Sequence, residues 1–201
     1  MRRSIFILVI FFSSIKSLPQ PPLTNEQKSA KKTFTYKTIG ELAIKADLFQ
    51  TRSDKILDPV IIWIHGGGLI FGGRDALREE QMKLYVGAGY SVVSIDYRLA
   101  PETKLPEIAS DIRDAIQWTR TNGADSLSVD STKIFVIGHS GGAYLALMSG
   151  YLLKNPPKAI VSFYGYGDIA GDWYAKPDSL YRTGKAPRRS KAQLAAMIFL
   201  N

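Results

Sequence analysis

Four short apolar runs constrain the fold of this chain more than any other feature of its sequence. The runs are PVIIWIH at 59–65, YSVVSIDY at 90–97, KIFVIG at 133–138 and KAIVSFYG at 158–165. They are rich in Val and Ile and are continuously apolar, which is typical of strands buried on both faces of a sheet. The sequence therefore predicts a mainly parallel sheet covered by helices.

Segments of helical length separate these runs. Residues 75–89 end in glycine, and we place their N-cap at Asp75. Residues 105–123 carry apolar residues near helical spacing and also stop at glycine. A third helix is predicted over 141–153, before the NPP that follows it.

The chain begins its folded part differently. Polar and apolar residues alternate over 34–49 on both sides of Gly40, which indicates two antiparallel strands joined by a tight turn. An antiparallel start followed by alternating strands and helices predicts the α/β class: a three-layer sandwich with a mostly parallel sheet.

The stretch VIGHSGGAY at 136–144 places Ser140 between glycines, where a buried run meets a predicted helix. A G-x-S-x-G pattern in this setting is typical of a nucleophile elbow, a sharp turn that exposes the serine hydroxyl. We therefore predict that Ser140 is a catalytic nucleophile. The alternative is a glycine-rich turn with an incidental serine.

A second glycine-rich stretch, WIHGGGLIFGG at 63–73, also follows an apolar run. Backbone N–H groups left bare by glycines can stabilise the oxyanion that forms when an ester carbonyl is attacked. We assign this role to Gly67 and Gly68, together with Gly141, which follows the serine. A phosphate loop is not favoured, because no G-K-[ST] ends the stretch.

The motifs HGGG, DYRLAPE and GHSGG occur in this order and resemble the hormone-sensitive-lipase-like branch of the α/β-hydrolase fold, which includes carboxylesterases and acetyl esterases. The resemblance covers about residues 34–181. It implies hydrolysis of a small-molecule ester through an acyl-serine, with neither a metal nor an organic cofactor. It also implies structural roles for His65, Asp96 and Arg98, the last two holding the glycine loop and its neighbours.

The substrate is less readable than the chemistry. Six residues could line an acyl or aryl pocket, although the core is the more common place for such side chains: Leu69, Phe71, Tyr144, Tyr164, Tyr166 and Trp173. We expect a small aliphatic or acetylated ester. An amidase or peptidase would use the same residues.

A general base for Ser140 is not apparent in the sequence. The chain contains two histidines, His65 and His139. His65 belongs to the glycine loop, and His139 precedes the serine on a sharp turn, where adjacent side chains diverge. A serine hydroxyl needs a base to become a nucleophile, so we expect this chain to be nearly inactive by itself.

The acid of a catalytic triad is equally unsupported. Asp168 follows the last predicted strand, which is too early for the acid in the order Ser, acid, His of this fold, and Asp172 and Asp178 are equally unsupported. Three explanations stay open: the front part of a longer hydrolase, a subunit completed by a second chain, or a non-catalytic relative that binds a ligand. We expect the first, with a sheet edge left uncovered.

The N-terminal residues predict export. Residues 1–17 have two arginines, an apolar run and small polar residues, in the order of a secretory signal peptide. The apolar run is well short of the roughly 20 residues of a spanning helix, so no stable membrane anchor is expected. Residues 18–32 are interpreted as a disordered connector and 33–201 as an incomplete hydrolase domain. We expect a secreted or periplasmic protein.

The net charge of +8 does not by itself indicate nucleic-acid binding. No recognition module for nucleic acid accompanies the basic residues. We therefore interpret the excess as a solvated surface, and expect a small-molecule ester and not a nucleic acid as the partner.

Overall fold

The computed structural model describes residues 30–50 and 57–167 of the chain. The predicted signal peptide and residues 18–29 of the predicted connector lie outside these described residues, as does the chain from 168 onward.

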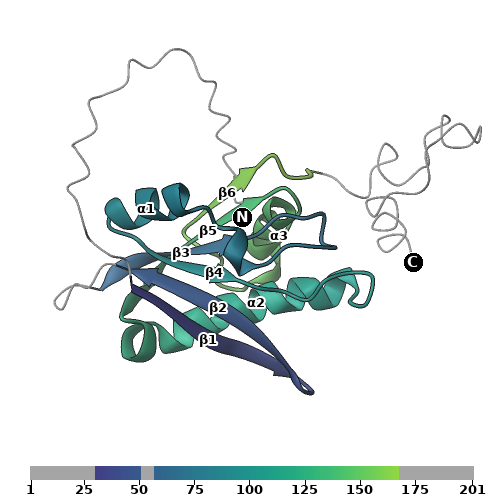
Figure 1. Cartoon of the computed structure of the whole chain (residues 1–201), viewed down its shortest axis with the longest axis horizontal. Coiled ribbons are helices and arrows are strands. Elements are labelled where there is room, and N and C mark those ends of the chain that lie inside the picture. Colours follow the sequence, from purple (N-terminus) through teal and green to yellow (C-terminus); the bar gives the residue numbers. More distant parts are fainter. Residues whose placement is uncertain (1–29, 51–56, 168–201) are drawn as a thin grey trace, which may run out of the picture.

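A six-stranded mixed sheet forms the middle of the molecule, in the order β1-β2-β4-β3-β5-β6 (Figure 1). β4, β3, β5 and β6 run parallel, whereas β1 and β2 are antiparallel to each other and β2 is antiparallel to β4. The predicted α/β class and its mainly parallel sheet are therefore confirmed. The strands are β1 (Ala30–Ile39), β2 (Leu42–Gln50), β3 (Asp58–Ile64), β4 (Ser91–Ile95), β5 (Val129–His139) and β6 (Ala159–Phe163).

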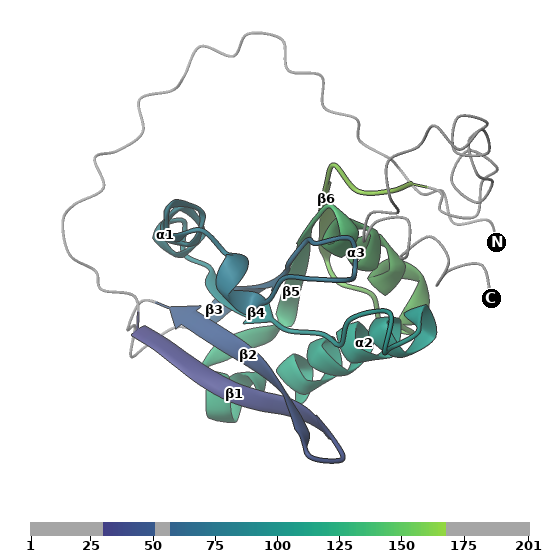
Figure 2. The ribbon, with the colours of Figure 1, turned by 45° about the vertical axis from the view of Figure 1, so that its right-hand side comes forward.

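Helices cover both faces of the sheet unequally. α2 (Leu105–Asn122) and α3 (Gly141–Leu152) lie on one face, and α1 (Glu79–Gly87) lies on the other (Figure 2). Short helical turns occupy Arg74–Ala76 (η1) and Gly123–Leu127 (η2). Within the described part of the chain, no helix is long and apolar enough to cross a membrane.

The strand residues alternate between two hydrophobic clusters. Ile62 and Ile64 of β3 face the large cluster under α2 and α3, while Ile61 and Trp63 face a small cluster under α1. Since successive side chains of a strand point to opposite faces, a continuously apolar strand requires cover on both. The central strand β3 has helices packed on both of its faces.

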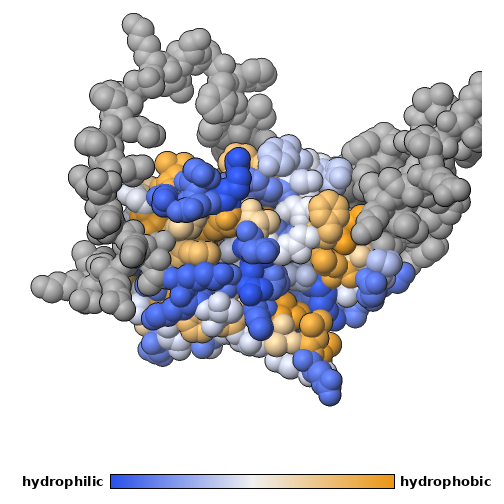
Figure 3. Space-filling view, in the orientation of Figure 1, coloured by the Kyte–Doolittle hydropathy of each residue, from blue (hydrophilic) through white to orange (hydrophobic). Residues whose placement is uncertain are grey.

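The β1–β2 hairpin turns at Gly40, whose φ of +57° lies in the left-handed region that glycine adopts most easily. Its tip extends past the helices and leaves Ile39 and Leu42 42% and 54% exposed. Figure 3 shows apolar side chains around this tip and hydrophilic side chains over α1.

Two element boundaries differ from the sequence prediction. Asp75 is not the N-cap of α1, because η1 occupies its position and α1 begins at Glu79 after Arg78. Contacts of Arg74 with a distant strand, described below, hold η1 in place. β1 begins at Ala30, so residues 30–32 of the predicted connector are paired with β2.

Candidate active site

Ser140 occupies a strained turn between β5 and α3. Its φ of 54° and ψ of −117° place a non-glycine residue in a sparsely populated region, as a nucleophile elbow requires. Its N–H donates to Phe163 O at the end of β6 (3.0 Å), and its carbonyl accepts from Ala143 N (3.0 Å) in the first turn of α3. Backbone contacts on both sides therefore maintain the turn.

Glycines allow α3 to approach the sheet closely beneath this turn. A Cβ atom at Gly142 would lie 2.2 Å from His65 O and 2.4 Å from Ile64 O, both backbone atoms at the end of β3. A larger residue would push the start of α3, and the serine with it, away from β3.

The glycine loop lies directly against the serine turn. A Cβ at Gly141 would lie 3.1 Å from the amide nitrogens of Gly68 and Leu69. A Cβ at Gly67, where φ is +109°, would collide with Phe71 O at 1.8 Å, because the Gly67 carbonyl accepts from Ile70 N (3.0 Å) in a tight turn.

The amides of this region are available for a ligand. Among the described residues, no backbone acceptor pairs with the N–H of Gly67, Gly68, Leu69 or Gly141 outside regular secondary structure. Gly141 is the first residue of α3, where the helix has no acceptor for the N–H. The arrangement brings free donors beside Ser140, which is what stabilisation of a developing oxyanion needs.

His65 is buried below the loop. It has no exposed surface, and its ring stacks on Tyr97 with centroids 4.1 Å apart. Nδ1 lies 2.7 Å from Gly66 O, and burial lowers the pKa of His65, so the ring is neutral and donates from Nδ1. The ring packs beneath the glycine loop and does not reach solvent.

His139 is occupied by partners other than the serine. Its Nδ1 lies 2.7 Å from Tyr164 Oη, and its Nε2 lies 3.1 Å from the amide nitrogen of Gln81. The Gln81 amide is a donor, so Nε2 accepts and Nδ1 carries the proton. Burial, followed by the charge of Arg78, lowers the pKa of His139. Both ring nitrogens are therefore engaged away from Ser140.

Asp96 fixes the end of the glycine loop. Its carboxylate accepts from the Arg74 backbone N–H (2.8 Å) and from the Arg74 guanidinium (2.5 Å). Arg74 Nε also lies 3.0 Å from Asp47, a 1% exposed carboxylate on β2 that pairs with Lys31 as well (2.8 Å). The loop is thereby tied to two strands.

Arg98 serves a different element. Its Nε and Nη2 donate to the two oxygens of Asp111 at 2.8 and 2.9 Å, and its backbone N–H adds a third bond to the same carboxylate. Asp111 is fully buried in α2 and also accepts from Lys37 on β1 (2.6 Å). Arg98 thus anchors α2 and not the glycine loop itself.

The residues proposed to line a substrate pocket differ widely in how much of each side chain is exposed. Leu69 is 2% exposed, whereas Phe71 and Tyr164 are 58% and 74% exposed. Tyr144 and Tyr166 are half-buried, and Trp173 lies outside the described residues. A cavity of about 450 Å³ lies between the start of β2 and residues 96–103, but Ser140 does not line it.

The predicted acids Asp168, Asp172 and Asp178 also lie outside the described residues. Within residues 30–50 and 57–167, no group of three potential metal ligands comes together.

Sequence reasoning missed the contribution of the Leu69 amide, and it missed Arg74 and Asp47 altogether. The Leu69 amide is positioned like that of Gly68, but nothing about a leucine in the sequence indicates that its N–H is free. Arg74 directly follows the glycines of the loop, which was a usable signal. Asp47 carried none, because its partners come from β1 and η1.

The chain resembles known proteins in both sequence and structure. The BD-FAE family model matches residues 46–176. The non-reducing polyketide synthase adrD of Penicillium rubens is 32% identical over 189 residues, which are 86% of this chain. The aligned part is 8% of that synthase, so the chain spans less than a tenth of this curated relative.

Several solved structures with a similar fold are esterases. Carboxyl esterase 2 from Tuber melanosporum has a TM-score of 0.64 and 26% identity, over 91% of this chain and 62% of that protein. Thermogutta terrifontis esterase 2 phosphoramylated by tabun has a TM-score of 0.55 and 25% identity, over 62% of this chain and 48% of that one. The chain therefore corresponds to part of each esterase.

Proposed function

Since this chain belongs to the BD-FAE family and has the α/β-hydrolase fold, we propose that it is the nucleophile-bearing part of a serine ester hydrolase. The observation that carries the proposal is the strained Ser140 turn packed against the free amides of Gly68 and Leu69. Its proposed substrates are small aliphatic or acetylated esters.

The reaction would proceed by acyl transfer. Ser140 Oγ attacks the carbonyl carbon, its proton passes to a base, and the carbonyl oxygen becomes an oxyanion. The amides of Gly67, Gly68 and Gly141, with that of Leu69, are the proposed donors to this oxyanion. The alcohol leaves with the proton, and water then hydrolyses the acyl-serine by the same steps.

The base is proposed to come from polypeptide outside these 201 residues. The two histidines of the chain are His65, which is buried, and His139, whose ring nitrogens are both engaged. β6 pairs with β5 and with no other described strand, so its free edge is where further strands would attach. The hydrogen bond from Ser140 N to Phe163 O joins this edge to the nucleophile turn.

Rescue by imidazole tests the proposal on the chain as it exists. Free imidazole supplies a base, so p-nitrophenyl acetate should acetylate Ser140 in an imidazole-dependent manner, detected by mass spectrometry of peptides. Without imidazole, turnover should lie near background, since losing the base of a triad costs on the order of 10⁶ in kcat.

The control variants separate site chemistry from background. Imidazole also hydrolyses the ester in solution, so the Ser140→Ala rate is subtracted, and Ser110→Ala on α2 controls for acetylation of another hydroxyl. Acetylation that persists in Ser140→Ala, or that never occurs at Ser140, would refute the nucleophile assignment. Fast turnover without imidazole, lost in Ser140→Ala, would refute the external base.

A non-catalytic relative that binds a ligand at this site is the second candidate, favoured by the engagement of His139. It predicts ligand binding with no acetylation of Ser140 even with imidazole. A panel of esters, thioesters and amides on a completed enzyme would separate an esterase from an amidase.

Export is a further part of the proposal and rests on the order of residues 1–17. Expression with and without these residues, followed by N-terminal sequencing of secreted material, tests it. Retention of the full-length chain inside the cell would contradict it.

A further inference from the structure

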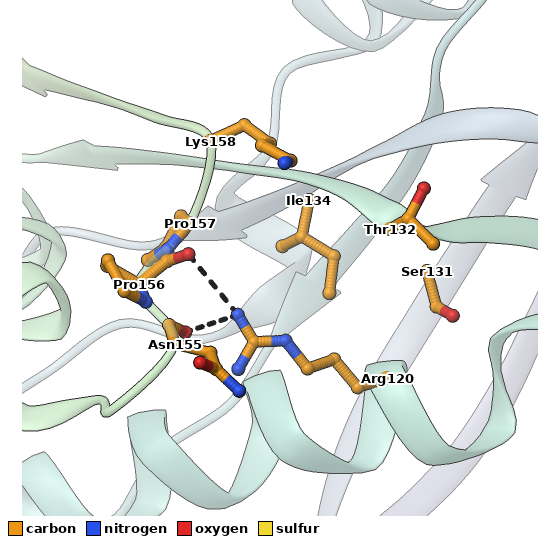
Figure 4. A pocket seen from close by; sticks show the side chains of 8 residues that line it. All are labelled: Arg120, Ser131, Thr132, Ile134, Asn155, Pro156, Pro157 and Lys158. Atoms are coloured by element: carbon orange, nitrogen blue, oxygen red, sulfur yellow. Dashed lines mark hydrogen bonds between the residues drawn. The ribbon is translucent and has the colours of Figure 1, made fainter.

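A second cavity, of about 340 Å³, lies at the end of the sheet opposite Ser140 (Figure 4). Four segments of the chain meet there: α2, the first half of β5, the connector after α3, and the residue that precedes β6. Because Ser140 follows the last residue of β5, a ligand here would not contact the nucleophile. The lining residues are Arg120, Ser131, Thr132, Ile134, Asn155, Pro156, Pro157 and Lys158.

The lining carries two cations and no carboxylate. Among the described residues, neither Arg120 nor Lys158 has an acidic partner within 4.0 Å. Asp130 precedes two of the lining residues, but its oxygens are bound by Thr132 and Lys133. The positive charge of the cavity is therefore not neutralised by a described ion pair.

Arg120 is held in place before any ligand arrives. One of its terminal nitrogens donates to the carbonyls of Asn155 (2.5 Å) and Pro156 (3.4 Å), which fixes the guanidinium at the wall. Its remaining N–H groups have no hydrogen-bond partner among the described residues. A preorganised guanidinium loses less entropy when it binds an oxyanion.

Lys158 is the second cation that lines the cavity. Its backbone N–H donates to Ile134 O (2.8 Å), which fixes the point from which its side chain extends. Figure 4 shows the ammonium group of Lys158 and the guanidinium of Arg120 on either side of Ile134. Ser131 lines the same space, but Figure 4 shows its hydroxyl turned away from the two cations.

We propose that this cavity binds a small phosphate monoester. Two cations on opposite sides of Ile134 match a group whose charge is about −1.5 to −2 at neutral pH and whose oxygens can accept from both. A cavity of about 340 Å³ is in the size range of small-molecule sites. Pro156 is the exposed apolar residue of the lining and provides contact for the organic part, whereas Ile134 and Pro157 are buried.

Isothermal titration of the full chain with phenyl phosphate tests the proposal. Lys158→Met should weaken binding at least about tenfold, since it removes one of the two charges. Lys154→Met is the matched control, because this exposed lysine is close in sequence but does not line the cavity. It should change the Kd by less than about twofold. Arg120→Met is a weaker test, because Arg120 also holds the connector.

Each comparison ligand has a defined meaning. Phenyl phosphate should bind more tightly than inorganic phosphate, which lacks the apolar part, and than benzoate, which has one charge. Equal affinity for benzoate would overturn the phosphate assignment, and equal affinity for inorganic phosphate would overturn the monoester. No binding at ~10 mM phenyl phosphate, or equal losses in Lys158→Met and Lys154→Met, would overturn the site.

Discussion

β3 and β6 are both short apolar strands of the parallel part of the sheet, yet their side chains are buried to very different extents. In β3, residues Val60–Ile64 are at most 4% exposed, because β4 and β5 flank the strand and helices cover both faces. In β6, Val161 and Phe163 are 41% and 39% exposed. An apolar strand needs other elements packed on both of its faces, which its composition indicates. Whether they are present depends on the neighbouring strands and helices.

The exposed face of β6 lies close to the candidate active site. Ile160 of β6 packs toward α3 and the large cluster, so one face of β6 is partly covered. The other face continues the α1 side of the sheet, where Val161 is the register partner of Ile137. The uncovered face therefore adjoins the strand that carries His139, and it ends where Phe163 binds the serine turn.

Truncating one side chain in each strand should give the largest contrast. Ile62→Ala in β3 should lower the free energy of unfolding by about 2–5 kcal/mol, because Ile62 is fully buried and a cavity is left. Val161→Ala in β6 should cost less than about 1 kcal/mol, because much of Val161 already faces solvent. Urea denaturation followed by circular dichroism measures both. Equal losses would mean that β6 is covered in solution.

Close backbone approach sharpens the same comparison. Gly142→Ala places a Cβ 2.2 Å from His65 O, so α3 must shift from β3 at a cost of about 1–3 kcal/mol or more. Gly167→Ala, after β6, meets no atom within 4 Å and should stay within about 0.5 kcal/mol. Thermal unfolding of both variants checks this, and an unaffected Gly142→Ala would argue against the tight α3–β3 contact.

Acid titration tests the buried carboxylate of Asp47 on β2, in the part of the sheet away from β6. Burial alone would raise the pKa of Asp47, but Lys31, Thr33 and Arg74 outweigh it and lower the pKa. A carboxyl with a lowered folded pKa stabilises the fold above its usual value near 3.9, and this contribution is lost as pH falls through the folded value.

Asp47→Asn should therefore cost about 1–3 kcal/mol at neutral pH, and less as the pH approaches about 3. Urea unfolding at several pH values measures the difference. Glu41→Gln, at the exposed hairpin turn, should change stability by less than about 0.5 kcal/mol throughout. A pH-independent loss in Asp47→Asn would contradict the role of its charge.

A charge on the uncovered face should have the smallest effect on stability. Val161→Lys should change the free energy of unfolding by less than about 0.5 kcal/mol, but it should reduce self-association, because charged residues protect exposed sheet edges. Leu84→Lys on α1 is the control, since Leu84 is 55% exposed but lies on a helix. Sedimentation velocity compares the variants. Strong destabilisation by Val161→Lys would show that the face is occupied.

Much of the fold follows from local patterns. The predicted strand at 158–165 became β6 (Ala159–Phe163), and the predicted helix at 141–153 became α3 (Gly141–Leu152). Apolar runs and helical periodicity are properties of neighbouring residues, so they can be read in the sequence. The Ser140 turn is local in the same sense, because it joins two elements that the sequence predicts.

The sequence by itself determined the α/β sheet, the serine turn and the shortage of histidines. Tertiary structure alone decided that the Leu69 amide lies beside Gly141, that Asp47 supports Arg74, and that His139 binds Gln81 and Tyr164. These contacts join residues distant along the chain, and their distances depend on how strands and helices pack. No local pattern encodes such packing, so these contacts of the candidate site form only when the sheet is assembled.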